Sequence, residues 1–365
     1  MSLTTIFILA ILLLGFLITF QIAKASEYVG ILKGEKKTLE QNNRINAFLL
    51  MVFLVGGLIG VYCCHEMFKG KILGEAASDH GQKIDSMLLK TLVITGIVFV
   101  LTQILLFWFA FKYQYSEKRK AYYLPHNNTL ELIWTVVPAI FLTVLVGYGL
   151  FYWFKITGDA PKDALVVEVT GKQFNWIYRY PGKDDVFGRK YYKNIDDAAD
   201  NSLGLIWRDV PSLNLKEDKA AQDDIVVDKL MLVAGKPVKL IIGSRDVIHD
   251  VGLVHFRMKM DAVPGTPTTM WFTPLYTTKE MKVKTNNPDF VYEISCDQMC
   301  GKGHYSMKGQ IEVVTQAEFD AWILSQKPKY QTAVLDKEKT EKPATDSTKT
   351  AMVAAEGANT VAAKK

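Results

Sequence analysis

The sequence has few cysteines, little net charge, and long stretches without any charged residue. Only four of its 365 residues are cysteine, and none of them begins a C-x-x-C-H motif. Four cysteines are too few for a disulfide scaffold, and the missing motif excludes a covalently attached haem in this chain. The formal net charge is only +5, and the basic excess lies in loops and in the C-terminal tail. Nucleic acid is therefore not an expected partner.

Four uncharged, apolar runs lie in the first part of the chain, at residues 1–23, 47–64, 91–111 and 132–154. A helix needs about 20 apolar residues, each rising 1.5 Å, to cross a hydrocarbon core of roughly 30 Å. The sequence therefore predicts four transmembrane helices in a lipid membrane, and a wholly soluble protein is excluded.

The Lys and Arg residues between these runs predict their orientation. The first and third connections together carry nine Lys and Arg, whereas the second carries four. Because cytoplasmic loops are enriched in these residues, both ends of the chain are expected outside. Ala23-Lys24-Ala25 also fits a signal-peptidase site, but no basic residue precedes the first run. We therefore expect this first helix to be retained.

From Ala164 the pattern changes to short β-rich stretches separated by Gly, Pro and Asn, which is typical of an antiparallel sandwich. Residues 182–224 are expected to form a polar excursion between strands, and the Lys-, Glu- and Ala-rich tail after Lys327 is expected to be disordered. The predicted strands lie at 165–169, 174–180, 225–227, 237–242, 270–272, 290–295 and 310–314.

The most informative segment runs from Cys296 to Met307. It contains two cysteines, a histidine and a methionine at C-x3-C-x3-H-x2-M spacing. Thiolate, imidazole and thioether are the ligands of copper electron-transfer sites, and His249 or His255 can supply a second imidazole. A single cysteine gives a mononuclear site. Two cysteines allow both sulfurs to bridge two copper ions that share one electron and change little in geometry on reduction.

Two other uses of these residues are open on spacing alone. Structural zinc also takes Cys and His, but it has no use for Met307. A disulfide between Cys296 and Cys300 would leave His304 and Met307 without a function. The complete set of soft ligands therefore favours copper.

These residues resemble subunit II of the haem-copper cytochrome c oxidases, which carries a binuclear copper A site in a cupredoxin domain. The resemblance covers roughly residues 88–325. Besides the copper loop it rests on His126-Asn127-Asn128-Thr129-Leu130-Glu131 with Trp134-Thr135 and Pro138, Gly171-Lys172-Gln173-Phe174-Asn175-Trp176, Asp246-Val247-Ile248-His249 and Met260-Asp261-Ala262-Val263-Pro264-Gly265.

The resemblance implies a set of site residues. Glu131 falls where the family has the carboxylate at the entrance of a proton channel into subunit I; the alternative is an ordinary interfacial acid. The Asp-Val before His249 favours it over His255, which we interpret as a satisfied or surface histidine. Copper A is then bound by His249, Cys296, the backbone carbonyl of Gln298, Cys300, His304 and Met307.

Two positions depart from the family pattern. Residue 298 is often a glutamate that helps to bind magnesium at the boundary with subunit I, and the uncharged Gln298 argues against that ion here. The tryptophan through which electrons usually arrive aligns with Phe174, so Phe174 and Trp176 are both candidates for this role. Trp176 is equally well explained as a core packing residue. Cys63 and Cys64 are assigned no role.

The implied fold is a set of N-terminal transmembrane α-helices followed by an all-β, cupredoxin-like Greek-key sandwich. Residues 1–87 are expected to form an extension with two extra helices, 88–157 a transmembrane hairpin, 158–326 the extracytoplasmic copper A domain, and 327–365 a disordered tail. The expected location is the bacterial inner membrane, with the copper domain on the periplasmic side.

The implied function is respiratory. Cytochrome c, or a c-type haem domain, reduces two copper ions, and the electron passes to haem in subunit I, where oxygen is reduced to water and protons are pumped. The partners are subunit I and other oxidase subunits. One rival reading is a copper-binding or copper-delivery protein, against which Glu131 and the Trp134 to Pro138 helix argue. Another is a quinol-oxidising relative without copper, which the complete ligand set opposes.

Overall fold

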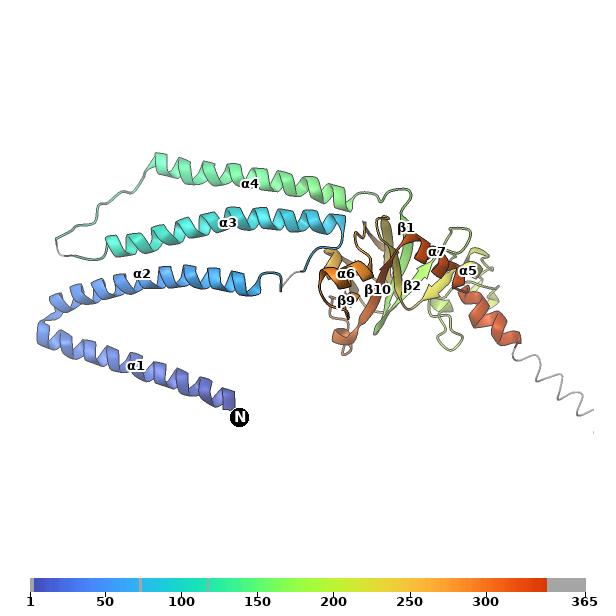
Figure 1. Ribbon diagram of the computed structural model, residues 1–365, viewed down its shortest axis with the longest axis horizontal. Coiled ribbons are helices and arrows are strands. Elements are labelled where there is room, and N and C mark those ends of the chain that lie inside the picture. Colours follow the sequence, from blue (N-terminus) through green and yellow to red (C-terminus); the bar gives the residue numbers. More distant parts are fainter. Residues whose placement is uncertain (1–2, 72–73, 117, 340–365) are drawn as a thin grey trace, which may run out of the picture. The chain divides into compact units, whose positions relative to one another are not determined.

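The computed structural model describes residues 3–71, 74–116 and 118–339. The chain divides into two compact units (Figure 1). We call residues 3–71 and 88–145 the helical unit, and residues 74–87 and 146–339 the outer unit.

Among the described residues, four helices are long and apolar enough to cross a membrane, as the uncharged runs predict. They extend beyond those runs at α1 (Leu3–Lys33), α2 (Glu35–Phe68), α3 (Asp79–Lys112) and α4 (Asn128–Thr157). Gly34, with φ of +85°, separates α1 from α2. Glycine adopts this conformation at little cost, which explains why the chain turns sharply between α1 and α2.

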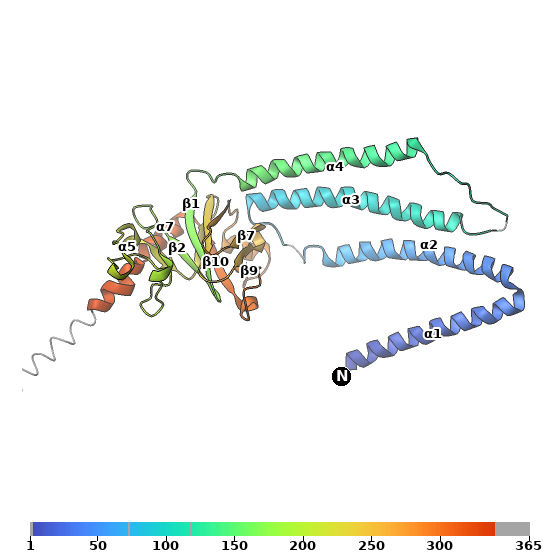
Figure 2. The ribbon, with the colours of Figure 1, turned by 180° about the vertical axis from the view of Figure 1, so that it is seen from behind.

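The outer unit contains ten strands in two five-stranded sheets. The sheet orders are β3-β2-β1-β5-β8 and β4-β10-β9-β6-β7. Figure 2 shows the strands from behind, with β1, β2, β7, β9 and β10 labelled. The strands are β1 (Leu165–Lys172), β2 (Asn175–Tyr180), β3 (Ile225–Val227), β4 (Leu230–Val233), β5 (Val238–Ser244), β6 (His249–Leu253), β7 (Met258–Ala262), β8 (Thr268–Phe272), β9 (Tyr292–Cys296) and β10 (Lys308–Val314).

One hydrophobic core joins both sheets. Val169 and Leu240 of the first sheet and Val251 and Ile311 of the second are fully buried in the same cluster. Burial alternates along β5, whereas β1, β2 and β6 are buried at consecutive positions. The predicted fold class, transmembrane helices followed by a cupredoxin-like β domain, is therefore confirmed.

The expectation of purely antiparallel sheets is wrong. β1 pairs in parallel with β5, and β10 pairs in parallel with β4. In each parallel pair the two strands are separated by a long stretch of sequence, as a parallel connection requires. Both sheets are therefore mixed.

The polar excursion, residues 182–224, has its own small core. Leu205, Trp207 and Ala221 are buried there together with Ile177 of β2. Three short helices connect or cover the strands: α5 (Ala220–Asp223) in the excursion, then α6 (Thr278–Lys284) and α7 (Gln316–Ser325).

The prediction of disorder after Lys327 is wrong for residues 329–339, which form a helix. Ala333 of this helix is buried in the excursion core, and Tyr330 packs its ring 5.9 Å from Trp207. Burial of these few apolar groups stabilises a segment whose composition alone looks disordered. The remainder of the predicted tail, 340–365, lies outside the described residues.

The boundary expected at residue 87 also differs from the structure. Residues 74–87 belong to the outer unit, where Ala77, Ser78 and His80 are fully buried. Arg257 holds this segment by donating to both carboxylate oxygens of Asp85, each at 3.0 Å. The segment before α3 and the first turns of α3 are therefore part of the outer unit rather than of the extension.

Candidate metal centre

Strand pairing brings the predicted ligands together from distant parts of the sequence. His249 is the first residue of β6, and Cys296 is the last residue of β9. The two strands are antiparallel neighbours, with Val251 opposite Cys296. The Cys296 amide then donates to the Met307 carbonyl at 3.1 Å, which closes the loop between β9 and β10. The motif from Cys296 to Met307 and the distant His249 thus meet at one end of the second sheet.

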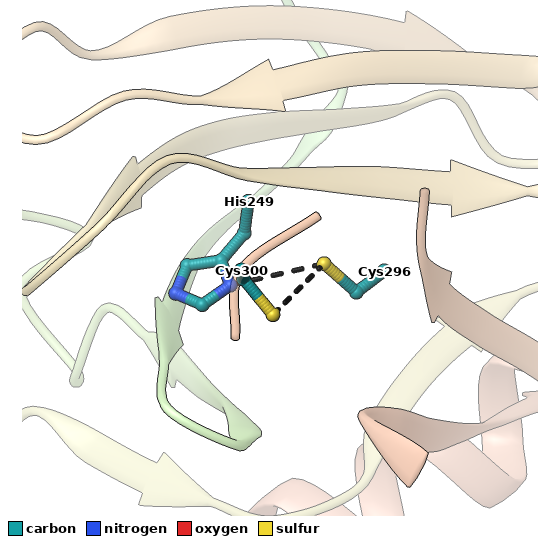
Figure 3. Close-up of side chains that lie close together, drawn as sticks. All are labelled: His249, Cys296 and Cys300. Atoms are coloured by element: carbon teal, nitrogen blue, oxygen red, sulfur yellow. Dashed lines mark hydrogen bonds between the residues drawn. The ribbon is translucent and has the colours of Figure 1, made fainter. Parts of the chain in front are cut away.

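The donor atoms of all six predicted ligands lie close to one another. The Cys296 and Cys300 sulfurs are 3.7 Å apart, and Cys296 Sγ is 3.8 Å from His249 Nδ1 (Figure 3). These three residues form a buried group that could hold a metal ion. Cys300 Sγ lies 3.8 Å from both His304 Nδ1 and Met307 Sδ, and the Gln298 carbonyl oxygen is 3.1 Å from Cys296 Sγ.

This donor set fits a pair of soft metal ions. Two sulfurs that each lie roughly 2.3 Å from one ion at a tetrahedral angle are about 3.8 Å apart, close to the 3.7 Å between the Cys296 and Cys300 sulfurs. Each cysteine also has its own histidine nitrogen at 3.8 Å. Thiolate, imidazole and thioether together select copper among the common metals.

Four of the six residues of the centre are shielded from water, whereas His304 is half-buried and Gln298 is exposed. His249 and Met307 are fully buried, and Cys300 is 3% exposed. Burial, reinforced by the neighbouring Cys296, raises the pKa of the Cys300 thiol to about 11. Without metal this thiol therefore keeps its proton at neutral pH, and metal binding must release it.

A carboxylate fixes the orientation of His249. Asp246 Oδ1 lies 2.8 Å from His249 Nε2, and Asp246 Oδ2 accepts the Gln173 amide at 2.7 Å. With the proton on Nε2, the Nδ1 lone pair faces the cysteines. Metal-binding histidines generally use such a partner to set their tautomer. Asp246 was not among the predicted site residues, although its spacing three residues before His249 could have indicated this contact.

Gly171 makes room for this histidine. A Cβ atom at Gly171 would lie 2.7 Å from His249 Cδ2 and 3.2 Å from the Trp176 ring. Any other residue would push the imidazole out of place, which gives the glycine in the Gly171 to Trp176 motif a direct structural reason.

The second residue that sequence reasoning missed is Gln173. Its side-chain amide donates to the Cys300 carbonyl at 2.6 Å. The adjacent Phe174 ring covers the copper loop so closely that a Cβ at Gly303 would meet it at 2.5 Å. Phe174 is partly buried, whereas Trp176 is 3% exposed and has its ring centroid 6.0 Å from that of His249.

The other candidate residues lie elsewhere. His255 packs against Phe290 and Tyr292, with ring centroids 5.0 and 5.6 Å away, and burial lowers its pKa. Glu131 is exposed in the first turn of α4, within the helical unit. Cys63 and Cys64 are exposed near the end of α2.

Comparison with known proteins agrees with this arrangement. Residues 66–151 match the transmembrane domain of cytochrome c oxidase subunit II, and residues 165–314 match its periplasmic domain. An alternative cytochrome c oxidase subunit 2 from Bradyrhizobium diazoefficiens is 32% identical over 67% of this chain and 80% of its own length. A cytochrome c oxidase subunit 2 from Cereibacter sphaeroides is 25% identical over 64% and 72% of the two chains.

A solved structure is also similar. The periplasmic domain of subunit II of cytochrome oxidase from Bradyrhizobium japonicum is 26% identical, with a TM-score of 0.29, and covers 45% of this chain and 94% of its own. The family matches span α3, most of α4 and the domain that holds the His249, Cys296 and Cys300 group. This chain therefore belongs to the family of cytochrome c oxidase subunit II, a component of haem-copper terminal oxidases with a copper A type domain.

Proposed function

We propose that this chain is the electron-accepting subunit of a respiratory cytochrome c oxidase. Cytochrome c, or a c-type haem domain, is the electron donor, and haem in subunit I is the acceptor that supports oxygen reduction and proton pumping. The observation that carries the proposal is the convergence of six donor groups around the paired sulfurs of Cys296 and Cys300.

Two copper ions bound here supply a one-electron carrier. The residues of the chain determine how well the site performs. The buried ends of β6 and β9 fix the positions of His249 and Cys296, so the ligands need little rearrangement when the charge of the centre changes. Asp246 holds the imidazole in one tautomer, and the buried Met307 keeps water from the sulfurs. Rigid, dry surroundings are the conditions that favour fast electron transfer.

Phe174 is the better supported of the two candidates for the residue where electrons arrive. Its ring is partly exposed and lies over the copper loop, next to Gly303. Trp176 is buried behind His249. We propose that Trp176 packs the core and that the donor docks over Phe174.

Gln298 contributes only its carbonyl, and its exposed, uncharged side chain gives no support for magnesium.

We further propose that the chain lies in a bacterial inner membrane with the copper domain in the periplasm. Lys37 and Arg44 from the first basic connection line one cavity together with Arg119 from the third. This contact supports placing both basic connections on the same, cytoplasmic side. Labelling of Lys36 or Lys37 by an impermeant reagent added outside intact cells would contradict this orientation.

The binuclear site is tested by paramagnetic resonance and metal analysis of the intact oxidase. We expect two coppers in this subunit, a purple colour and a seven-line hyperfine pattern in the oxidised state. His249→Ala should abolish this pattern, whereas the control His255→Ala should retain it. A four-line spectrum with one copper per chain would exclude the proposed centre.

A further inference from the structure

The helical unit contains a basic cavity that the copper chemistry does not use. It has a volume of about 440 Å³ and lies between α2 and the connection that follows α3. Its lining includes Lys37, Glu40, Gln41, Arg44, Ser116 and Arg119. None of these residues belongs to the copper centre or to the proposed proton channel.

The cavity carries an excess of positive charge. Among its described lining residues, Lys37, Arg44 and Arg119 are basic and only Glu40 is acidic. Within the part of the chain that the structure describes, no carboxylate pairs with Lys37 or Arg44. Arg119 is held in place because it donates to the Lys112 and Gln114 carbonyls at 2.7 and 3.2 Å. A fixed basic group beside two available ones suits an anion.

The position of these groups along the helices indicates which anion. Arg44 lies three residues, about 4.5 Å of helix rise, before the uncharged run of α2 that begins at Ala47. Arg119 bonds back to Lys112, the last residue of α3. Both guanidinium groups therefore lie at the edge of the apolar runs, at the depth of phospholipid headgroups rather than in open water.

We propose that this cavity binds the headgroup of an anionic membrane phospholipid. The phosphodiester is held by Arg44 and Arg119, and Lys37 supplies a further charge. The exposed Tyr115, which lines the cavity, is an amphipathic side chain suited to the membrane interface. The site ties the extension helix α2 to the connection before α4 through a shared lipid.

The test uses the intact oxidase complex and mass spectrometry of retained lipid. Phosphatidylglycerol is compared with phosphatidylcholine of identical acyl chains, with and without excess inorganic phosphate. We expect a preference for phosphatidylglycerol that inorganic phosphate does not abolish. The double variant Lys37→Gln, Arg44→Gln should lose this preference by roughly fivefold for each charge removed.

Two further variants complete the experiment. Lys69→Gln with Lys71→Gln removes the same charge beyond the other end of α2 and should leave the preference unchanged. If the double variant does not assemble, Lys37→Arg with Arg44→Lys retains both charges and should retain the lipid. An unchanged preference in the double variant, or no preference in the unmodified complex, would overturn the proposal. Displacement by inorganic phosphate alone would assign the cavity to a free anion instead, while the copper spectrum reports separately on the proposed function.

Discussion

At the scale of single residues, we expect Asp246 to position His249, one of the proposed copper ligands. Asp246 contacts His249 and the Gln173 amide at once. Asp246→Ala removes the acceptor for Nε2–H and frees the imidazole to take the other tautomer. We expect copper affinity to fall about 10- to 100-fold, measured by competition with a copper chelator. Asp289→Ala, on the exposed turn before β9, is the matched control, and equal affinities in the two variants would refute a positioning role.

The thioether sulfur of Met307 should tune the centre rather than build it. Its side chain is fully buried, 3.8 Å from Cys300. Met307→Leu retains the shape but not the sulfur, so copper should still bind while the reduction potential shifts and electron transfer slows. Redox titration and stopped-flow reduction measure the two effects. Met299→Leu on the same loop, where Met299 is 76% exposed, should change neither; an unchanged potential in Met307→Leu would argue against ligation.

The grouping of the six candidate donors could be predicted from the sequence because most of the set is local. Five of the six groups lie within the twelve residues from Cys296 to Met307, so their spacing alone indicates their chemistry. Asp246 and Gln173 were not accessible in this way, because their roles arise from β1, β6 and the loop meeting in space. Whether these groups bind copper as proposed is a question for the spectroscopic test.

At the scale of elements, short or polar strands escaped the sequence analysis. β4 has four residues, and β6 and β7 carry Asp250 and Asp261 opposite one another in their pairing. Period-two patterns need longer, less polar stretches to be recognised. The parallel pairs and the helix at 329–339 were also missed, since both depend on tertiary packing and not on local propensity.

A buried ion-pair network should hold the excursion to the first sheet. Arg179 of β2 contacts Glu168 of β1 at 2.6 Å and Asp224 at 3.1 Å, and all three side chains are at most 8% exposed. Arg179→Met leaves the buried Asp224 without its ion-pair partner and leaves Glu168 with Lys190 alone. Removing one partner of a buried ion pair costs about 3–5 kcal/mol of unfolding free energy.

The corresponding fall in thermal midpoint is on the order of 10 °C for a domain of this size. Loss of the copper absorption on heating of the assembled oxidase measures it. Arg189→Met breaks the exposed pair with Asp218 and should cost at most about 1 kcal/mol. Equal midpoints for the two variants would show that the buried network is not what stabilises the excursion.

At the scale of the whole molecule, uncharged runs were enough to predict four membrane-spanning helices. The runs did not predict the full length of these helices, because charged and polar residues extend α2 and α3 well beyond the apolar runs. The assignment of residues 74–87 to the outer unit also depends on long-range contacts, such as Ser78 Oγ donating to the Phe256 carbonyl at 2.6 Å. Hydropathy reports on membrane insertion and carries no information about such docking.

The proton-channel role proposed for Glu131 can be separated from electron transfer because of where the residue lies in α4. Glu131 is in the first turn of α4 and belongs to the helical unit, and α4 continues to Thr157. That length of helix rises about 39 Å, enough to cross the hydrocarbon core. A substitution at this end of the helix should therefore leave the copper centre undisturbed.

Glu131→Ala should preserve the copper spectra and cytochrome c binding but lower steady-state oxygen reduction. The carboxylate is exposed at the end of an apolar run, where it is easily hydrated, so its removal should cost little stability. A loss of rate must then come from proton supply, and small carboxylic acids added to the buffer should restore part of it. Glu35→Ala, in the first turn of α2, is the matched control and should turn over normally. If Glu131→Ala reduced oxygen at the unmodified rate in an assembled complex, the channel role would be abandoned and Glu131 would be an ordinary interfacial acid.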